Sequence, residues 1–156
     1  IDITRGIADQ VSYNDIVSMY SRLLPTSHDN SVWIMNHSTL PQLMSMADSG
    51  NNLVWQPTQA VGIGEALPMT LFGRRIFWTE KNSTLGTRGD VILADLSSYA
   101  IGLRSELIIE TSNAPGWLRD VISVRAILRL DGQGLLDDAI TPADGGNTLS
   151  SFVTLA

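Results

Sequence analysis

A chain of 156 residues and 16.9 kDa is the size of one ordinary domain and can fold without disulfides or metals. It has no cysteine, which excludes disulfide scaffolds, zinc–thiolate sites, iron–sulfur clusters and thiol catalysis. Its net charge of −6 disfavours a protein that binds nucleic acid through the phosphate backbone. The longest uninterrupted apolar runs, such as Val91–Ala94, have four residues, so no transmembrane helix is predicted.

Two amphipathic helices are predicted in the first third of the chain, with a short strand between them. Ser12 is a candidate N-cap, and Asp15 three residues later completes a capping box; the apolar residues that follow recur at helical spacing until Pro25. The apolar run at 32–35 has the length of a strand. A second helix is predicted from Ser38 or Thr39 onward, because apolar residues again recur at helical spacing.

Strand patterns dominate the remainder of the chain, at 70–80, 90–94, 106–111, 120–131 and 152–155. The 90–94 run is typical of a strand covered on both faces. The clearest alternation lies in 120–131 and predicts an inward apolar face made of Ile122, Val124, Ala126, Leu128 and Leu130, with Ser123, Arg125 and Arg129 on the other face. On this interpretation Leu128→Ala costs about 2–5 kcal/mol. Helices early and strands late predict an α+β fold.

No motif predicts a catalytic, cofactor or metal site. His28 and His37 are the two candidate catalytic bases, but the chain contains no Gly-x-Ser-x-Gly motif to present the serine nucleophile of a Ser–His–Asp hydrolase. The Gly62–Leu67 segment begins like a dinucleotide-binding loop, but it lacks the third glycine and leads to Pro68 instead of a helix. The carboxylates between Asp131 and Asp144 lack the spacing of an EF-hand. We therefore expect no enzyme, no cofactor and no bound metal.

The chain contains four tryptophans, Trp33, Trp55, Trp78 and Trp117. A platform for stacking bases would need a basic groove around the rings, which the negative charge disfavours. Core or interface anchoring is the favoured interpretation, because tryptophan combines a large apolar area with one polar group.

The order of several segments carries a more specific signal. These segments are Val32–Thr39 with Asp48-Ser49-Gly50, Leu71–Ile76, Val91–Tyr99, Trp117–Asp120 followed by Val124–Ala126 and Arg129–Gly132, and Phe152-Val153. They resemble segments of the tailed-phage major capsid protein family and occur in the same order. The family segments are W-x-M-N-x-x-T…D-x-x-G, L-x-G-x-P-V, G-D-F-S-x-Y, F-x-x-D…R-A…R-x-D-G and A-F-V. Arg75 stands where the family has proline.

This resemblance implies a fold and a division into domains. The fold is the α+β Hong Kong 97-like phage capsid fold, with a mixed sheet and flanking helices in an axial domain and long antiparallel strands in a peripheral domain. We expect residues 1–116 to be mainly axial domain, 117–142 the long peripheral strands and 143–156 a returning C-terminal strand. The family's N-terminal arm and extended loop precede this region, and we expect them to be absent from this chain.

The resemblance also implies a function and partners. It predicts a structural major capsid protein of a phage or prophage that assembles in the bacterial cytoplasm, as hexamers and pentamers, into the icosahedral shell of a virion. The shell would enclose DNA without specific binding; scaffold, protease and portal proteins are further expected partners, and no membrane is involved. An encapsulin-like nanocompartment shell is the nearest alternative. A small hydrolase or ligand-binding domain, which would need convergent polar groups in a concave pocket, is another.

Candidate residues for subunit contacts follow from the same resemblance: Trp117, Arg119, Asp120, Arg125 and Arg129. Some family members join their subunits by an isopeptide bond between a lysine and an asparagine, and that asparagine aligns with Asp120. An ionised aspartate is a poor electrophile, so we expect no such bond. Asp120 would instead form a salt bridge with an arginine such as Arg119 or Arg125 of a neighbouring subunit, or be a solvated strand start.

Overall fold

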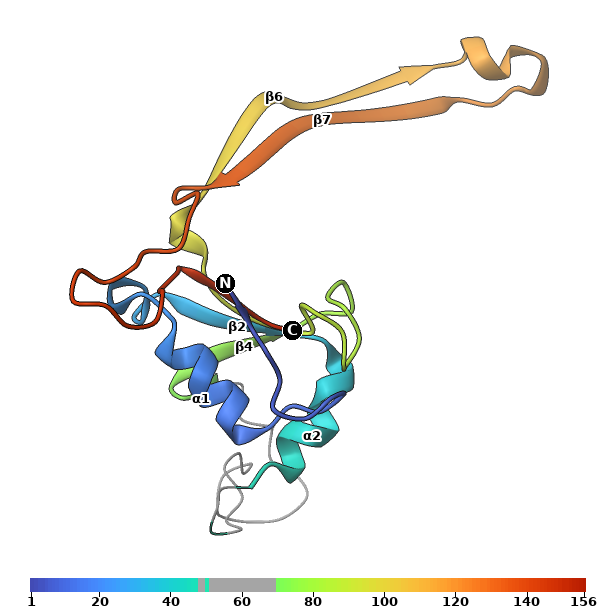
Figure 1. Ribbon diagram of the computed structural model, residues 1–156. Helices are drawn as coiled ribbons and strands as arrows, with labels where there is room; N and C mark the ends of the chain where they lie inside the picture. The colour runs from blue at the N-terminus through green and yellow to red at the C-terminus, as the bar shows by residue number, and fades with distance from the viewer. Residues whose placement is uncertain (48–49, 51–69) are drawn as a thin grey trace. The chain divides into compact units, whose positions relative to one another are not determined.

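The computed structural model describes residues 1–47, 50 and 70–156, which form two units (Figure 1). One unit, Ile1–Ser97 with Leu136–Ala156, contains a six-stranded sheet and both α-helices; the other, Ser98–Leu135, contains a two-stranded hairpin. The elements are β1 (Asp2–Ile3), α1 (Tyr13–Ser21), β2 (Ser31–Met35), α2 (Leu40–Ser45), β3 (Thr70–Leu71), β4 (Arg74–Trp78), β5 (Val91–Asp95), β6 (Tyr99–Ser112), β7 (Ser123–Gly134) and β8 (Phe152–Leu155), with 3₁₀ turns η1 (Pro25–Ser27), η2 (His37–Thr39), η3 (Leu96–Ser98) and η4 (Ala114–Arg119). The predicted α+β class is confirmed. Among the described residues, no helix is long and apolar enough to cross a bilayer.

Helix α1 begins at the predicted capping box. The Ser12 hydroxyl accepts a hydrogen bond from the Asp15 backbone N–H, and the Asp15 carboxylate accepts one from the Ser12 backbone N–H. The same carboxylate accepts the Gly6 N–H, at 3.0 Å, and so holds the N-terminal segment against the helix. Ile16 and Met19 are fully buried, because they lie on the helix face that packs on the core.

The six-stranded sheet has the order β1-β8-β5-β2-β4-β3. Strand β5 pairs antiparallel with β2 on one side and with β8 on the other, whereas β4 is parallel to β2 and β1 is parallel to β8. Val91 and Leu93, on one face of β5, are fully buried, and on the other face Ala94 is buried and Ile92 half-buried, as expected for a strand covered on both faces.

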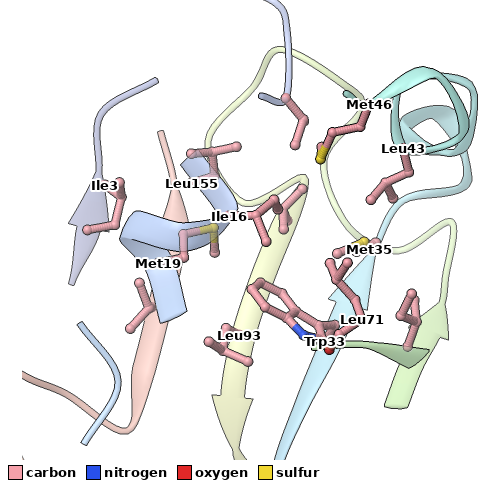
Figure 2. Packing of buried hydrophobic residues seen from close by; sticks show 14 of the residues in the cluster. Ile3, Ile16, Met19, Trp33, Met35, Leu43, Met46, Leu71, Leu93 and Leu155 are labelled. Carbon is pink, nitrogen blue, oxygen red and sulfur yellow. Dashed lines mark hydrogen bonds between the residues drawn. The ribbon is translucent and has the colours of Figure 1, made fainter. Parts of the chain in front are cut away.

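The apolar core of this unit lies between the sheet and the two helices (Figure 2). Trp33 of β2 is completely buried, and its indole N–H donates to the Leu71 carbonyl oxygen at 3.0 Å. Met19 of α1, Leu43 of α2 and Leu155 of β8 belong to the same cluster. Trp33 is therefore a core anchor, as predicted for the tryptophans.

The predicted strand at 70–80 is in fact two strands, β3 and β4, joined by a tight turn. The turn consists of Phe72 and Gly73, whose φ angles are both positive, at 49° and 73°. A positive φ is unusual for an aromatic residue. The Phe72 ring contacts two tyrosines of α1, with ring centroids 6.2 Å from Tyr13 and 5.5 Å from Tyr20. These contacts hold the turn against the helix.

A buried ion pair connects the N-terminal segment to the loop between β4 and β5. The Arg5 guanidinium lies 2.6 Å from the Asp90 carboxylate, and their side chains are 6% and 0% exposed. Arg5 also donates to the carbonyl oxygens of Gln10 and Thr87, and the other Asp90 oxygen accepts the Gly86 N–H. Buried charges of this kind are tolerated only when they are paired and hydrogen-bonded.

Candidate interaction surface

The second unit is a long antiparallel hairpin in which β6 and β7 run side by side (Figure 1). The register runs from Tyr99 opposite Gly134 to Ser112 opposite Ser123. Two register shifts, both between Leu103 and Ile108, make β6 two residues longer than β7, with 14 residues against 12. Such shifts are β-bulges, in which the extra residue stays unpaired. Strand β7 is regular throughout.

One face of the hairpin is apolar. Residues directly opposite in an antiparallel pair share a face, and alternate residues of a strand share a face. The apolar face is formed by Ile101, Leu103, Ile109, Val124, Leu128 and Leu130. No residue paired in register on this face is charged. These six side chains are exposed by half or more, from 50% for Leu128 to 71% for Ile101.

The prediction that this face is turned toward the core is wrong for the described chain. Val124, Ala126, Leu128 and Leu130 do share one face of β7, as the alternation indicated, but no described residue covers that face. Ile122 precedes β7 and is also exposed. Alternation identifies residues that share a face; it carries no information about what covers them. The cost of 2–5 kcal/mol predicted for Leu128→Ala therefore does not apply to an uncovered hairpin.

The opposite face carries the charged side chains that are paired in register; Arg104 and Glu106 lie in the bulged segment of β6. Glu110 stands opposite Arg125 and forms an ion pair with it. Arg129 stands opposite Ser105, and Asp131 opposite Gly102. We call this set, Glu110, Arg125, Arg129 and Asp131, the charged face. Arg125 and Arg129 therefore lie on the side of β7 that was predicted for them. Arg125 has its carboxylate partner, Glu110, within its own chain.

The remaining predicted contact residues lie where the two strands are joined. Trp117 and Arg119 belong to η4, and Trp117 is 74% exposed. Asp120 ends η4 in a left-handed conformation, with φ 52°, and β7 begins only at Ser123. Asp120 is therefore a turn residue that redirects the chain, and not the first residue of the strand.

The segment that connects β6 to β7 also contains a shallow hollow and one position, Gly116, that only glycine fits. The hollow has a volume of about 320 Å³ and is lined by Asn113, Gly116, Trp117, Asp120, Val121 and Ile122. A Cβ on Gly116 would lie 2.6 Å from the Val121 carbonyl oxygen, so no larger residue fits there without a shift of the backbone. Neighbouring Leu118 is 97% exposed, so this end of the hairpin presents apolar side chains beside polar ones such as Asn113 and Asp120.

Three residues of the apolar face come from β6 and were not identified from the sequence: Ile101, Leu103 and Ile109. The two register shifts lie between Leu103 and Ile108, so the phase of the alternation changes along β6 and the predicted strand at 106–111 covers only its second half. One signal could have identified them. A search for a second alternating segment, about 20 residues before the one at 120–131, finds β6 if the apolar positions are allowed to change from odd to even numbers, or the reverse, at a bulge.

The other sequence candidates do not converge on a second site. His28 packs edge-on against Tyr20, with ring centroids 4.6 Å apart, and His37 packs against Trp78 at 5.9 Å. Within the described part of the chain, no group of three His, Cys, Asp or Glu side chains is arranged to hold a metal. Gly62–Leu67 and Trp55 lie outside the described residues.

Comparisons with known proteins agree with the resemblance seen in the sequence. Residues 2–145 match the phage capsid family. Among solved structures, the capsid of an empty GTA particle and the capsid of a native GTA particle, both computed with C5 symmetry, are similar to this chain. Each has a TM-score of 0.72 and 16% sequence identity, over 99% of this chain and 48% of the capsid chain. No curated protein matches.

These matches identify the fold and the family. The chain has the Hong Kong 97-like capsid fold predicted from its segments, and it spans about half the length of the solved capsid chains that it matches. The family match covers nearly the whole sequence, including both helices, the hairpin and most of the sheet. The chain therefore belongs to the phage capsid family.

Proposed function

We propose that this chain is a structural subunit of a phage or prophage capsid, and that copies of it build an icosahedral shell around DNA. The observation that carries the proposal is the similarity of its fold to capsid chains over 99% of its length. The exposed apolar face of the hairpin supports it further. Large apolar surfaces on soluble proteins mark sites where another molecule binds, and a shell is built from many such contacts.

The distribution of charge also supports a container that encloses DNA without binding it specifically. The hairpin unit carries four arginines and four carboxylates, so the net charge of −6 lies entirely in the remainder of the chain. A surface with excess negative charge repels phosphates instead of releasing counterions from them. Packaged DNA would therefore remain free to leave the shell.

Within this proposal, the sheet unit corresponds to the axial domain and the hairpin to the peripheral domain. The axial domains would meet around the five-fold and six-fold axes, in pentamers and hexamers. The hairpin begins at Ser98, earlier than position 117, where the sequence placed the peripheral strands. Scaffold, protease and portal proteins remain expected partners of the assembling shell in the host cytoplasm.

The experiment is to purify dense particles from cells that carry the gene and to identify their proteins by mass spectrometry. Peptides of this chain should dominate the particle fraction, and the particles should contain DNA that resists nuclease. Particles that hold a protein cargo and no DNA would instead indicate an encapsulin-like compartment. Recovery of the chain only outside particles would refute a role in any shell. The same spectra would reveal portal, protease or scaffold proteins.

A further inference from the structure

We propose that the Asp131–Gly132 pair in β7 is a site of spontaneous covalent modification, at which the aspartate is converted through a cyclic imide to isoaspartate. The chain has two Asp–Gly pairs, Asp131–Gly132 and Asp144–Gly145. Their surroundings differ, because only the Asp131 carboxylate is hydrogen-bonded to the nitrogen that must attack it. This inference goes beyond the proposed function and does not depend on it.

The reaction needs only the two residues and water. The Gly132 backbone nitrogen forms a bond to Asp131 Cγ, the C–OH bond of the neutral carboxyl group breaks, and the hydroxyl leaves with the amide proton as water. Another water then adds to the main-chain carbonyl carbon of Asp131 and breaks the bond from that carbon to the Gly132 nitrogen. The chain now continues through Cβ and Cγ of residue 131, and the former main-chain carbonyl is a free carboxyl group. Glycine suits the second position, because it has no side chain to hinder the close approach of its backbone.

The side chain of Asp131 already lies against the attacking nitrogen. The Gly132 N–H donates to Asp131 Oδ1 at 2.8 Å, so Cγ, which is bonded to that oxygen, lies beside the nitrogen. Within the described residues Asp131 forms no ion pair, so no arginine draws the carboxylate away from this position. Holding two reacting groups side by side raises the rate of their reaction.

The nitrogen of the other Asp–Gly pair is engaged elsewhere. The Gly145 N–H donates to the Pro142 carbonyl oxygen at 3.1 Å and closes a turn. Attack on the Asp144 carboxyl group would first require that hydrogen bond to break. The chain therefore contains its own comparison site, with the same two residue types in a different hydrogen-bonding arrangement.

Ring closure also requires rotation of the Asp131 backbone, and the end of the hairpin allows it. Asp131 stands opposite Gly102, and Gly132 and Gly134 follow it in β7. A glycine inside a strand weakens it, because no side chain packs at that position. The last pair of the ribbon, Tyr99 with Gly134, lies close by, and strands open most easily at their ends.

Isoaspartate at this position would disturb the hairpin. It adds one carbon atom to the main chain of β7, so the residues after Asp131 can no longer keep their register with 99–101 of β6. The Tyr99 ring now lies against Gly132, where an added Cβ would be 2.4 Å from it, and this contact would be lost. The modification therefore loosens this end of the hairpin.

The test is to incubate the 156-residue chain for several weeks at neutral pH and physiological temperature and to analyse it by peptide mass spectrometry. Arg129 is the last basic residue, so trypsin releases Leu130–Ala156, and both Asp–Gly pairs are compared in one peptide. Electron-transfer fragmentation locates isoaspartate, and the imide is detected as the loss of one water. A parallel incubation in guanidinium chloride measures both sites without the fold.

In the folded chain, isoaspartate should accumulate about tenfold faster at residue 131 than at residue 144, because the reacting groups are already in contact. In guanidinium chloride the two rates should become similar. Asp131→Glu keeps the charge but would require a six-membered ring, so it should abolish the product at residue 131 and leave the rate at residue 144 unchanged. Asp144→Glu is the matched control and should leave the rate at residue 131 unchanged.

Three results would overturn the inference: no isoaspartate at residue 131 of the folded chain, a rate at residue 144 that equals or exceeds it, or the same preference for residue 131 in guanidinium chloride. The last result would assign the preference to local sequence instead of the fold. The modified chain, separated by chromatography, should also show faster hydrogen exchange of the amides at 99–102, and unchanged exchange would refute the loosening of the hairpin. None of these outcomes bears on the capsid role.

Discussion

Asp90→Asn removes the negative charge from the buried ion pair with Arg5 and leaves the shape of the side chain unchanged. Asp90 is fully buried, and the Arg5 side chain is only 6% exposed, so the guanidinium keeps its charge with little access to water. In the variant, the amide cannot accept from both Arg5 and the Gly86 N–H as the two carboxylate oxygens do. Breaking one side of a buried ion pair typically costs about 3–5 kcal/mol, and we expect the free energy of unfolding to fall by that amount.

The chain offers a matched control for this prediction. Asp29 also pairs with an arginine, Arg74, at 3.2 Å, but its side chain is 94% exposed. Asp29→Asn should therefore lower the free energy of unfolding by less than about 1 kcal/mol, the usual value for a surface ion pair. Urea titrations of both variants by circular dichroism give the two free energies by linear extrapolation. Hydrogen exchange of the β5 amides assigns the loss to the sheet unit.

A double variant separates the charge from the loss of contacts. Arg5→Met with Asp90→Asn removes both charges, so no uncompensated ion remains in the interior. We expect it to be destabilised by less than the sum of the two single variants, with a coupling of about 1–3 kcal/mol. The reasoning would be refuted if Asp90→Asn cost no more than Asp29→Asn, or if the two single effects simply added.

Three further outcomes are expected. Leu93→Ala, in the fully buried centre of β5, should lower the free energy of unfolding by about 2–5 kcal/mol in a urea titration; a loss below 1 kcal/mol would contradict this burial. Gly116→Ala should distort the connection between β6 and β7, because its Cβ would lie 2.6 Å from the Val121 carbonyl oxygen, whereas Gly102→Ala meets nothing closer than 3.8 Å; faster exchange of the Val121 amide, which donates to the Gly116 carbonyl oxygen, in the first variant alone is the measurement, and equal exchange in both would refute the clash. Ser12→Ala should cost about 0.5–2 kcal/mol by loss of the α1 cap, and unchanged thermal unfolding would show that the cap contributes nothing.

The elements that the sequence predicted well have local signals. The Ser12–Asp15 capping box sets the start of α1, and the uninterrupted apolar run of β5 reflects a strand with side chains buried or half-buried on both faces. The alternation of β7 is visible because that strand is regular, whereas the register shifts in β6 change the phase of its alternation between Leu103 and Ile108. The turn was missed because Phe72, unlike Gly73, is not a residue that such a turn normally selects.

The sequence predicted which residues of β7 share the apolar face, but not that this face is exposed. The residues that share the apolar side of β7 follow from alternation, yet their exposure depends on which other groups lie above the ribbon. The Arg5–Asp90 pair joins residues 85 positions apart and has no local sequence signal at all. Asp120 was assigned to a strand because Trp117–Asp120 was aligned as a unit, and the left-handed backbone that ends η4 was not visible in that alignment.

The turn at Phe72 has a consequence for how the sheet unit opens. A non-glycine residue held at positive φ costs about 1–3 kcal/mol, and here the ring contacts with Tyr13 and Tyr20 offset that cost. If α1 detaches, the contacts disappear and the backbone of the turn relaxes to a less strained form. Release of the turn likewise removes aromatic packing from α1. The helix and the β3–β4 turn, although far apart in sequence, should therefore open and close as one cooperative unit.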